Sequence, residues 1–89
     1  MAADSLGARS LGSVAWSVVR HFVDVAVTVT DDDIRSAQRA LWEEFRLIAE
    51  PGGAAALAGL RSGAYVPQLG ERVVVVVCGS NCDPATVTG

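Results

Sequence analysis

The feature that most constrains this chain is an unbroken run of five valines at residues 73–77, followed by Cys-Gly-Ser-Asn at residues 78–81. An apolar run without polar alternation predicts a strand covered on both faces, as in inner strands of parallel sheets. Small, turn-forming residues then end the strand at its carboxyl edge, where open α/β sheets bind ligands. The run therefore predicts a structural strand, with residues 78–81 as the candidate site.

The rest of the chain shows a regular order of predicted elements. Apolar residues at helical spacing predict helices over residues 13–22, 31–49 and 51–62, and a β-branched segment predicts another strand over residues 23–29. The order is helix, strand, helix, helix, strand, in which two parallel strands are joined by a helical crossover. We therefore predict the α/β class, with a partial parallel sheet whose open edges call for neighbours.

Residues at the expected helix ends support this assignment. Thr30 can cap the second helix, and the aspartates of residues 31–33 favour the positive end of its dipole. These aspartates could instead bind a divalent metal, but nothing nearby completes an oxygen cage. Pro51 suits the first position of the third helix, and Gly63 suits its C-cap. Glycine and alanine dominate that helix, so it can approach a neighbour or a ligand closely.

Composition limits the classes of partner and compartment. Eighty-nine residues suit one small domain, and a net charge of −3 argues against nucleic-acid and anionic-membrane partners. No apolar stretch is long enough to span a bilayer, and the first residues lack the pattern of a signal peptide. We therefore expect a cytoplasmic protein.

The two cysteines do not indicate a disulfide scaffold or a metal centre. Cys78 and Cys82 are separated by three residues, and His21, the only histidine, lies far away in the sequence. A zinc site usually needs four ligands, so we expect no metal. Free thiols in a reducing compartment are the expectation.

Three motifs occur in order along the chain: A-D-S-L at residues 3–6, E-P-x-G-A at residues 50–54, and C-G-x-N-x-D at residues 78–83. With the intervening helix they resemble the carboxyl-terminal part of the serine/threonine dehydratase family over residues 2–84. This family, which includes threonine ammonia-lyase and serine racemase, comprises pyridoxal-phosphate enzymes of the tryptophan synthase β-like fold (fold type II). The resemblance implies that residues 1–89 are a carboxyl-terminal portion of the catalytic domain, which is an incomplete domain.

The resemblance also implies cofactor-binding roles for five residues. Cys78 matches the neutral residue that hydrogen-bonds the pyridine nitrogen, and Glu50 matches the acid that lines the cofactor pocket. Ser5 matches a position whose backbone passes close to the ring, while Gly79 and Asn81 shape the loop after Cys78. A weak, neutral partner for the ring nitrogen moderates the ring as an electron sink and suits β-elimination.

The family's catalytic lysine has no counterpart here. All seven basic residues are arginines, so no Schiff base with the cofactor can form, and no glycine-rich phosphate cradle is present. In the intact family enzyme, lysine removes the α-proton of L-threonine and the β-hydroxyl leaves. Hydrolysis of the product gives 2-oxobutanoate and ammonia. We expect the chain to be inactive alone, without catalytic residues of its own.

Two other interpretations stay open at this stage. The chain could be a non-catalytic interaction module, or half of a split enzyme, that pairs its edges with a separately encoded N-terminal partner. It could also be a stand-alone nucleotide- or anion-binding α/β domain that uses the turn at residues 79–81. A lysine-bearing partner in the adjacent reading frame distinguishes the first, and ligand binding by the isolated chain distinguishes the second.

Overall fold

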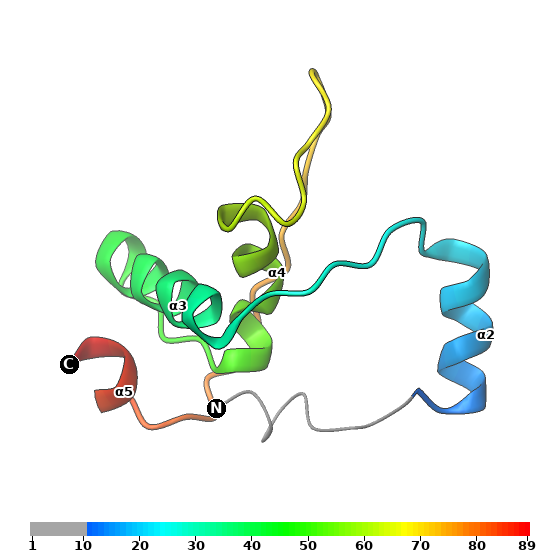
Figure 1. Cartoon of the computed structure of the whole chain (residues 1–89). Helices are drawn as coiled ribbons and strands as arrows, with labels where there is room; N and C mark the ends of the chain where they lie inside the picture. Colours follow the sequence, from blue (N-terminus) through cyan, green and yellow to red (C-terminus); the bar gives the residue numbers. More distant parts are fainter. Residues whose placement is uncertain (1–10) are drawn as a thin grey trace.

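The structure, a computed structural model, describes residues 11–89 and is helical. The described part contains α2 (Ser13–Phe22), α3 (Asp31–Phe45), α4 (Pro51–Arg61) and the short α5 (Ala85–Thr88). Helices α3 and α4 pack together, α5 lies against α3, and α2 stands apart at the end of an extended segment (Figure 1). The α3–α4 pair is therefore the centre of the fold.

Helix α3 begins at the cap that the sequence predicts. The Thr30 hydroxyl accepts a hydrogen bond from the Asp33 amide (3.1 Å), and the Asp33 carboxylate accepts one from the Thr30 amide (3.0 Å). The two bonds form a reciprocal capping box and satisfy amides that have no partner inside the helix. The predicted role of Thr30 is confirmed.

Helix α3 ends at Phe45, four residues earlier than predicted. Arg46 adopts a left-handed conformation with φ of 56°, and its amide donates to the Trp42 carbonyl at 2.9 Å. The Leu47 amide then donates back to the Leu41 carbonyl at 3.2 Å, which completes a helix-ending turn. The Arg46 guanidinium lies 5.0 Å from the centre of the Trp42 ring. This contact holds the turn against the helix end.

Helix α4 has the termini expected from its sequence. Pro51 occupies the first turn, and the cap residue Glu50 is extended. Gly63 follows the last turn with φ of 81°, a conformation that glycine adopts without the cost of a side chain. The Tyr65 amide donates to the Gly59 carbonyl at 3.0 Å and closes this end.

The core between α3 and α4 is small. Gln38 is buried beside it and donates to the Ala49 carbonyl at 2.8 Å. Val87 of α5 is also buried against α3, and the Arg39 guanidinium donates to its carbonyl at 3.0 Å. Phe45 is exposed, although its spacing places it on the apolar stripe. The core residues are Ile34, Ala37, Leu41, Ala49, Ala54 and Ala58.

The predicted α/β class with a partial parallel sheet is wrong. Between residues 11 and 89 the structure contains helices and no strand. Residues 24–29 and 73–77 lie outside the helices, and no hydrogen bond within the described part joins their backbones to another segment. Val74 is 88% exposed, whereas the prediction requires both faces to be covered. Side-chain patterning records a preference for burial, but a strand also needs a neighbour for its backbone groups.

Helix α2 is amphipathic as predicted, but it packs against no other helix of the described chain. Val14 and Phe22 are each 80% exposed, and no residue of α2 is buried. Its N-cap is Gly12, so the predicted cap at Ser13 is not formed. Separately, none of the helices between residues 11 and 89 is long and apolar enough to cross a membrane.

Candidate functional site

The segment after the valine run returns to the first turn of α4. The Cys78 amide donates to the Gly53 carbonyl at 3.4 Å, and the Glu50 amide donates to the Gly79 carbonyl at 3.0 Å. These two backbone bonds connect residues far apart in the sequence. Three of the predicted cofactor-binding residues, Cys78, Gly79 and Glu50, therefore lie together at the amino end of α4.

This contact depends on the absence of two side chains. A Cβ atom on Gly53 would lie 1.4 Å from the Cys78 carbonyl oxygen, and one on Gly79 would lie 1.9 Å from the Glu50 carboxylate. Gly79 also has φ of 73°, which disfavours any other residue. The backbone of residues 78–79 thus lies directly on α4, with only hydrogen atoms between.

The two side chains at this contact that the sequence predicts to bind the cofactor differ in exposure. The Cys78 thiol is free and its residue is exposed, whereas Glu50 is half-buried beside Gly79. In the described part of the chain, the Glu50 carboxylate has no side-chain hydrogen bond, even to the helix it caps. A thiol and a carboxylate are therefore both available to bind a group from outside this chain.

The contact that the structure describes does not include the other two predicted residues, Asn81 and Ser5. Asn81 is exposed on the loop that follows Gly79, and no hydrogen bond holds its side chain to the described residues. Ser5 lies outside the described residues. Cys82 is half-buried, with its sulfur 3.9 Å from the Ala49 carbonyl oxygen, so it packs against the segment leading into α4.

Gly53 was not predicted as a site residue, although it belongs to the E-P-x-G-A motif. The available signal was the glycine and alanine content of α4, which predicts a close approach without naming the neighbour. The structure identifies that neighbour as the peptide between Cys78 and Gly79. Gly53 is accordingly buried.

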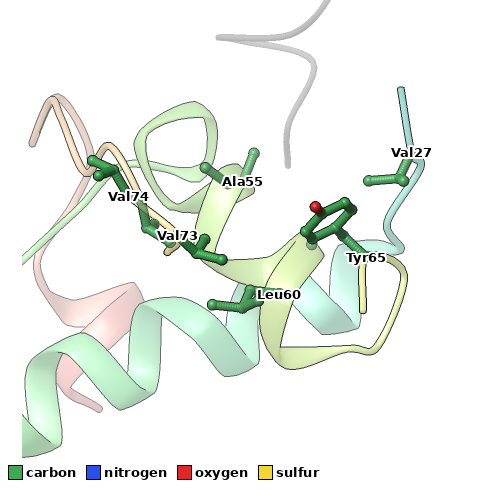
Figure 2. A pocket seen from close by; sticks show the side chains of 9 residues that line it. Val27, Ala55, Leu60, Tyr65, Val73 and Val74 are labelled. Carbon is green, nitrogen blue, oxygen red and sulfur yellow. The ribbon is translucent and has the colours of Figure 1, made fainter. Parts of the chain in front are cut away.

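An apolar groove of about 350 Å³ lies along α4 beside the candidate site (Figure 2). Val27 forms one side and the valine run forms the other, while α4 supplies the floor. Tyr65 is the only lining residue with an ionisable side chain, and none of the predicted site residues lines the groove. The groove is therefore better suited to packing against apolar groups than to catalysing a reaction. The lining residues are Val27, Ala55, Ala56, Gly59, Leu60, Tyr65, Val73, Val74 and Val75.

Metal ligands do not gather in the described part of the chain. Across residues 11–89, no three His, Cys, Asp or Glu side chains are grouped so that they could hold a metal ion. The aspartates of residues 31–33 lie in the first turn of α3, and Asp33 serves the capping box. Their observed arrangement is that of helix N-terminal residues.

Comparisons with known proteins give a consistent result. The chain matches the family described as pyridoxal-phosphate dependent enzyme over residues 1–79. It is 40% identical to phenylserine dehydratase of Ralstonia pickettii over 84 residues, which are 94% of this chain and 26% of that protein. It is 32% identical to serine racemase of Bos taurus over 81 residues, covering 89% of this chain and 24% of the relative.

A third relative extends the same pattern. The chain is 34% identical to the biosynthetic L-threonine dehydratase of Salmonella typhimurium over 82 residues, which are 89% of this chain and 16% of the relative. No solved structure matches the chain. The chain thus spans about a quarter or less of these relatives. It belongs to the pyridoxal-phosphate dependent enzyme family, as a segment related to its dehydratases and racemases.

Proposed function

We propose that this chain supplies one wall of the cofactor site in a pyridoxal-phosphate dependent dehydratase that acts on β-hydroxy amino acids. The observation that carries the proposal is the contact of Cys78 and Gly79 with the first turn of α4, beside Glu50. The family resemblance assigns these three residues to the cofactor. The structure places them together although they come from separate motifs.

The described residues fit one side of such a site and leave it incomplete. Pyridoxal phosphate, when bound, supplies a ring that withdraws electrons from the α-carbon of an amino acid. The Cys78 thiol is a neutral group suited to hydrogen-bond the ring nitrogen, and the Glu50 carboxylate is free to accept a hydrogen bond from a bound group. No lysine is present to hold the cofactor covalently, because every basic residue is an arginine.

The enzyme's chemistry therefore needs a lysine from outside these 89 residues. We propose a separately encoded N-terminal partner chain that contributes the lysine and the phosphate-binding loop, with this chain inactive alone. The named relatives include a phenylserine dehydratase and an L-threonine dehydratase. Phenylserine and threonine share a β-hydroxyl that leaves during β-elimination. For L-threonine, the products would be 2-oxobutanoate and ammonia.

A non-catalytic interaction module is the second candidate, and exposed apolar side chains favour it. Val74 and Val76 are 88% and 66% exposed, and the apolar stripe of α2 is uncovered by the described chain. Such surfaces are typical of sites that contact another protein. This candidate predicts binding to the partner without turnover.

One reconstitution experiment separates these functions. The purified chain is mixed with the polypeptide encoded upstream and with pyridoxal phosphate, and visible absorbance of the lysine-bound cofactor and 2-oxo acid release from L-threonine are measured. We expect both signals in the mixture and neither with this chain alone. Binding without turnover would favour the interaction module, and no binding would contradict both functions.

Substitutions of Cys78 test its role in the same mixture. Cys78→Ser keeps a neutral hydrogen-bonding group and should retain turnover. Cys78→Ala removes it and should lower turnover by about tenfold, the scale of one lost hydrogen bond. Cys82→Ala is the matched control and should leave turnover unchanged. Equal turnover in all three variants would show that the Cys78 side chain has no role in the cofactor site.

A further inference from the structure

Two buried glycines of α4 have different surroundings. At Gly53, a Cβ atom would lie 1.4 Å from the Cys78 carbonyl oxygen and 2.6 Å from its carbonyl carbon. At Gly59, a Cβ atom would lie 3.6 Å from a methyl group of Val27, which is ordinary contact. Both positions are helical and buried, so alanine is compatible with the local helical backbone at each. Of these two positions, Gly53 is the one at which the tertiary structure requires glycine.

We propose that Gly53 is a positioning residue for Cys78. Its missing side chain lets the peptide between Cys78 and Gly79 lie on the first turn of α4, which sets the position of Cys78 next to Gly79 and its contact with Glu50. The role of that thiol toward the cofactor rests on the proposed function. The positioning itself is a property of this chain and can be measured without the cofactor.

A side chain at Gly53 would overlap the Cys78 backbone, and no side-chain rotation could remove this overlap. The atoms nearest a Cβ on Gly53 belong to the backbone, so they cannot rotate away as the end of a flexible side chain can. The Cys78 carbonyl oxygen would have to move from 1.4 Å to at least 3.0 Å from that Cβ. Such a shift pulls on both backbone hydrogen bonds, from Cys78 to Gly53 and from Glu50 to Gly79. Alanine at this position therefore displaces the Cys78 segment from α4.

Gly79 makes a second close contact between the Cys78–Gly79 peptide and the residues at the start of α4. Its φ of 73° turns the chain just after Cys78, and its Cα lies against the Glu50 carboxylate. Because Gly79 packs on the Glu50 carboxylate, a displacement of the peptide also disturbs this contact. The positions of Cys78 and Glu50 are thus coupled through the two glycines.

Amide hydrogen exchange of Gly53→Ala and Gly59→Ala tests the proposal in the isolated chain. In Gly53→Ala we expect the amides of Cys78 and Glu50 to exchange about tenfold faster, because local opening exposes them. The Leu41 amide in α3 should keep its wild-type rate. Gly59→Ala should leave all three rates unchanged. The same loss in both variants, or no change in Gly53→Ala, would overturn the proposal.

Two further measurements extend the test, and the first needs no substitution at Gly53, so it applies even if Gly53→Ala unfolds. In the wild type, the Cys78 amide must exchange more slowly than the Val76 amide, which has no hydrogen bond in the described structure; equal rates would overturn the proposal. In a Cys82→Ser background, Gly53→Ser should alter the alkylation rate of the Cys78 thiol severalfold, while Gly59→Ser should not. Failure of the wild-type mixture to release 2-oxo acid would count against the proposed function alone, since neither measurement needs the partner or the cofactor.

Discussion

Tyr65 and Glu71 close the turn that leads from α4 to the valine run. The Tyr65 hydroxyl donates to the Glu71 carboxylate at 2.8 Å, and the Gln68 amide donates to the same oxygen at 2.9 Å. The bond from Tyr65, followed by that from Gln68, lowers the pKa of Glu71 below its ordinary value of 4.5. The same hydrogen bond to Glu71 is the main cause that raises the pKa of Tyr65 above 10.0.

These shifts predict the pH range in which the turn is closed. A lowered Glu71 pKa stabilises the turn above pH 4.5, and this contribution is lost as the pH falls through the folded-state pKa. A raised Tyr65 pKa stabilises it below pH 10.0, and this contribution is lost as the pH rises through the folded-state pKa. An NMR titration of the Glu71 carboxyl carbon should show the lowered pKa. Tyr65→Phe should return it toward 4.5, and an unchanged titration would contradict the hydrogen bond.

At the scale of elements, α3 depends on its capping box. Thr30→Ala removes the hydroxyl that accepts from the Asp33 amide, so we expect a loss of about 1 kcal/mol in the free energy of unfolding. Urea unfolding followed by circular dichroism measures this change. Thr28→Ala is the matched control, because Thr28 is exposed and has no hydrogen bond in the described structure. Equal losses in the two variants would show that the cap does not stabilise α3.

At the scale of the whole molecule, we expect the exposed valines to cause self-association. Val74 and Val76 carry apolar side chains into solvent on a segment whose backbone groups are unpaired within the described chain. Such a segment is prone to pair with other chains. The small α3–α4 core does not cover it.

Threonine substitutions test this expectation, because threonine keeps the shape of valine and adds a hydroxyl. The double variant Val74→Thr and Val76→Thr should self-associate less in sedimentation experiments, with unchanged helix content. Val66→Thr is the control, since Val66 is 75% exposed but lies outside the run. If Val66→Thr reduces self-association equally, general surface hydrophobicity and not the run is responsible. In the reconstituted mixture, the double variant should also weaken partner binding.

Predictions that depend on neighbouring residues were the most accurate. Thr30, Pro51 and Gly63 act at helix ends through backbone groups a few residues away, so the sequence specifies their roles locally. The end of α3 was missed because its left-handed residue is Arg46, whereas glycine or asparagine is the residue type that usually marks such a helix end. The candidate site was indicated by three motifs, of which the structure brings two into contact. The first motif lies outside the described residues.

The sequence by itself determined α2, α3 and α4, the end-capping roles of Thr30 and Gly63, the family and the absence of a lysine, because each is recorded in residue identity or short-range spacing. Only the tertiary structure decided that the two β-branched segments remain unpaired, since strand pairing depends on a neighbour and not on the segment alone. It also decided that Gly53 meets the Cys78 carbonyl. That contact joins positions distant in the chain through backbone atoms, which leave no pattern of side chains to recognise.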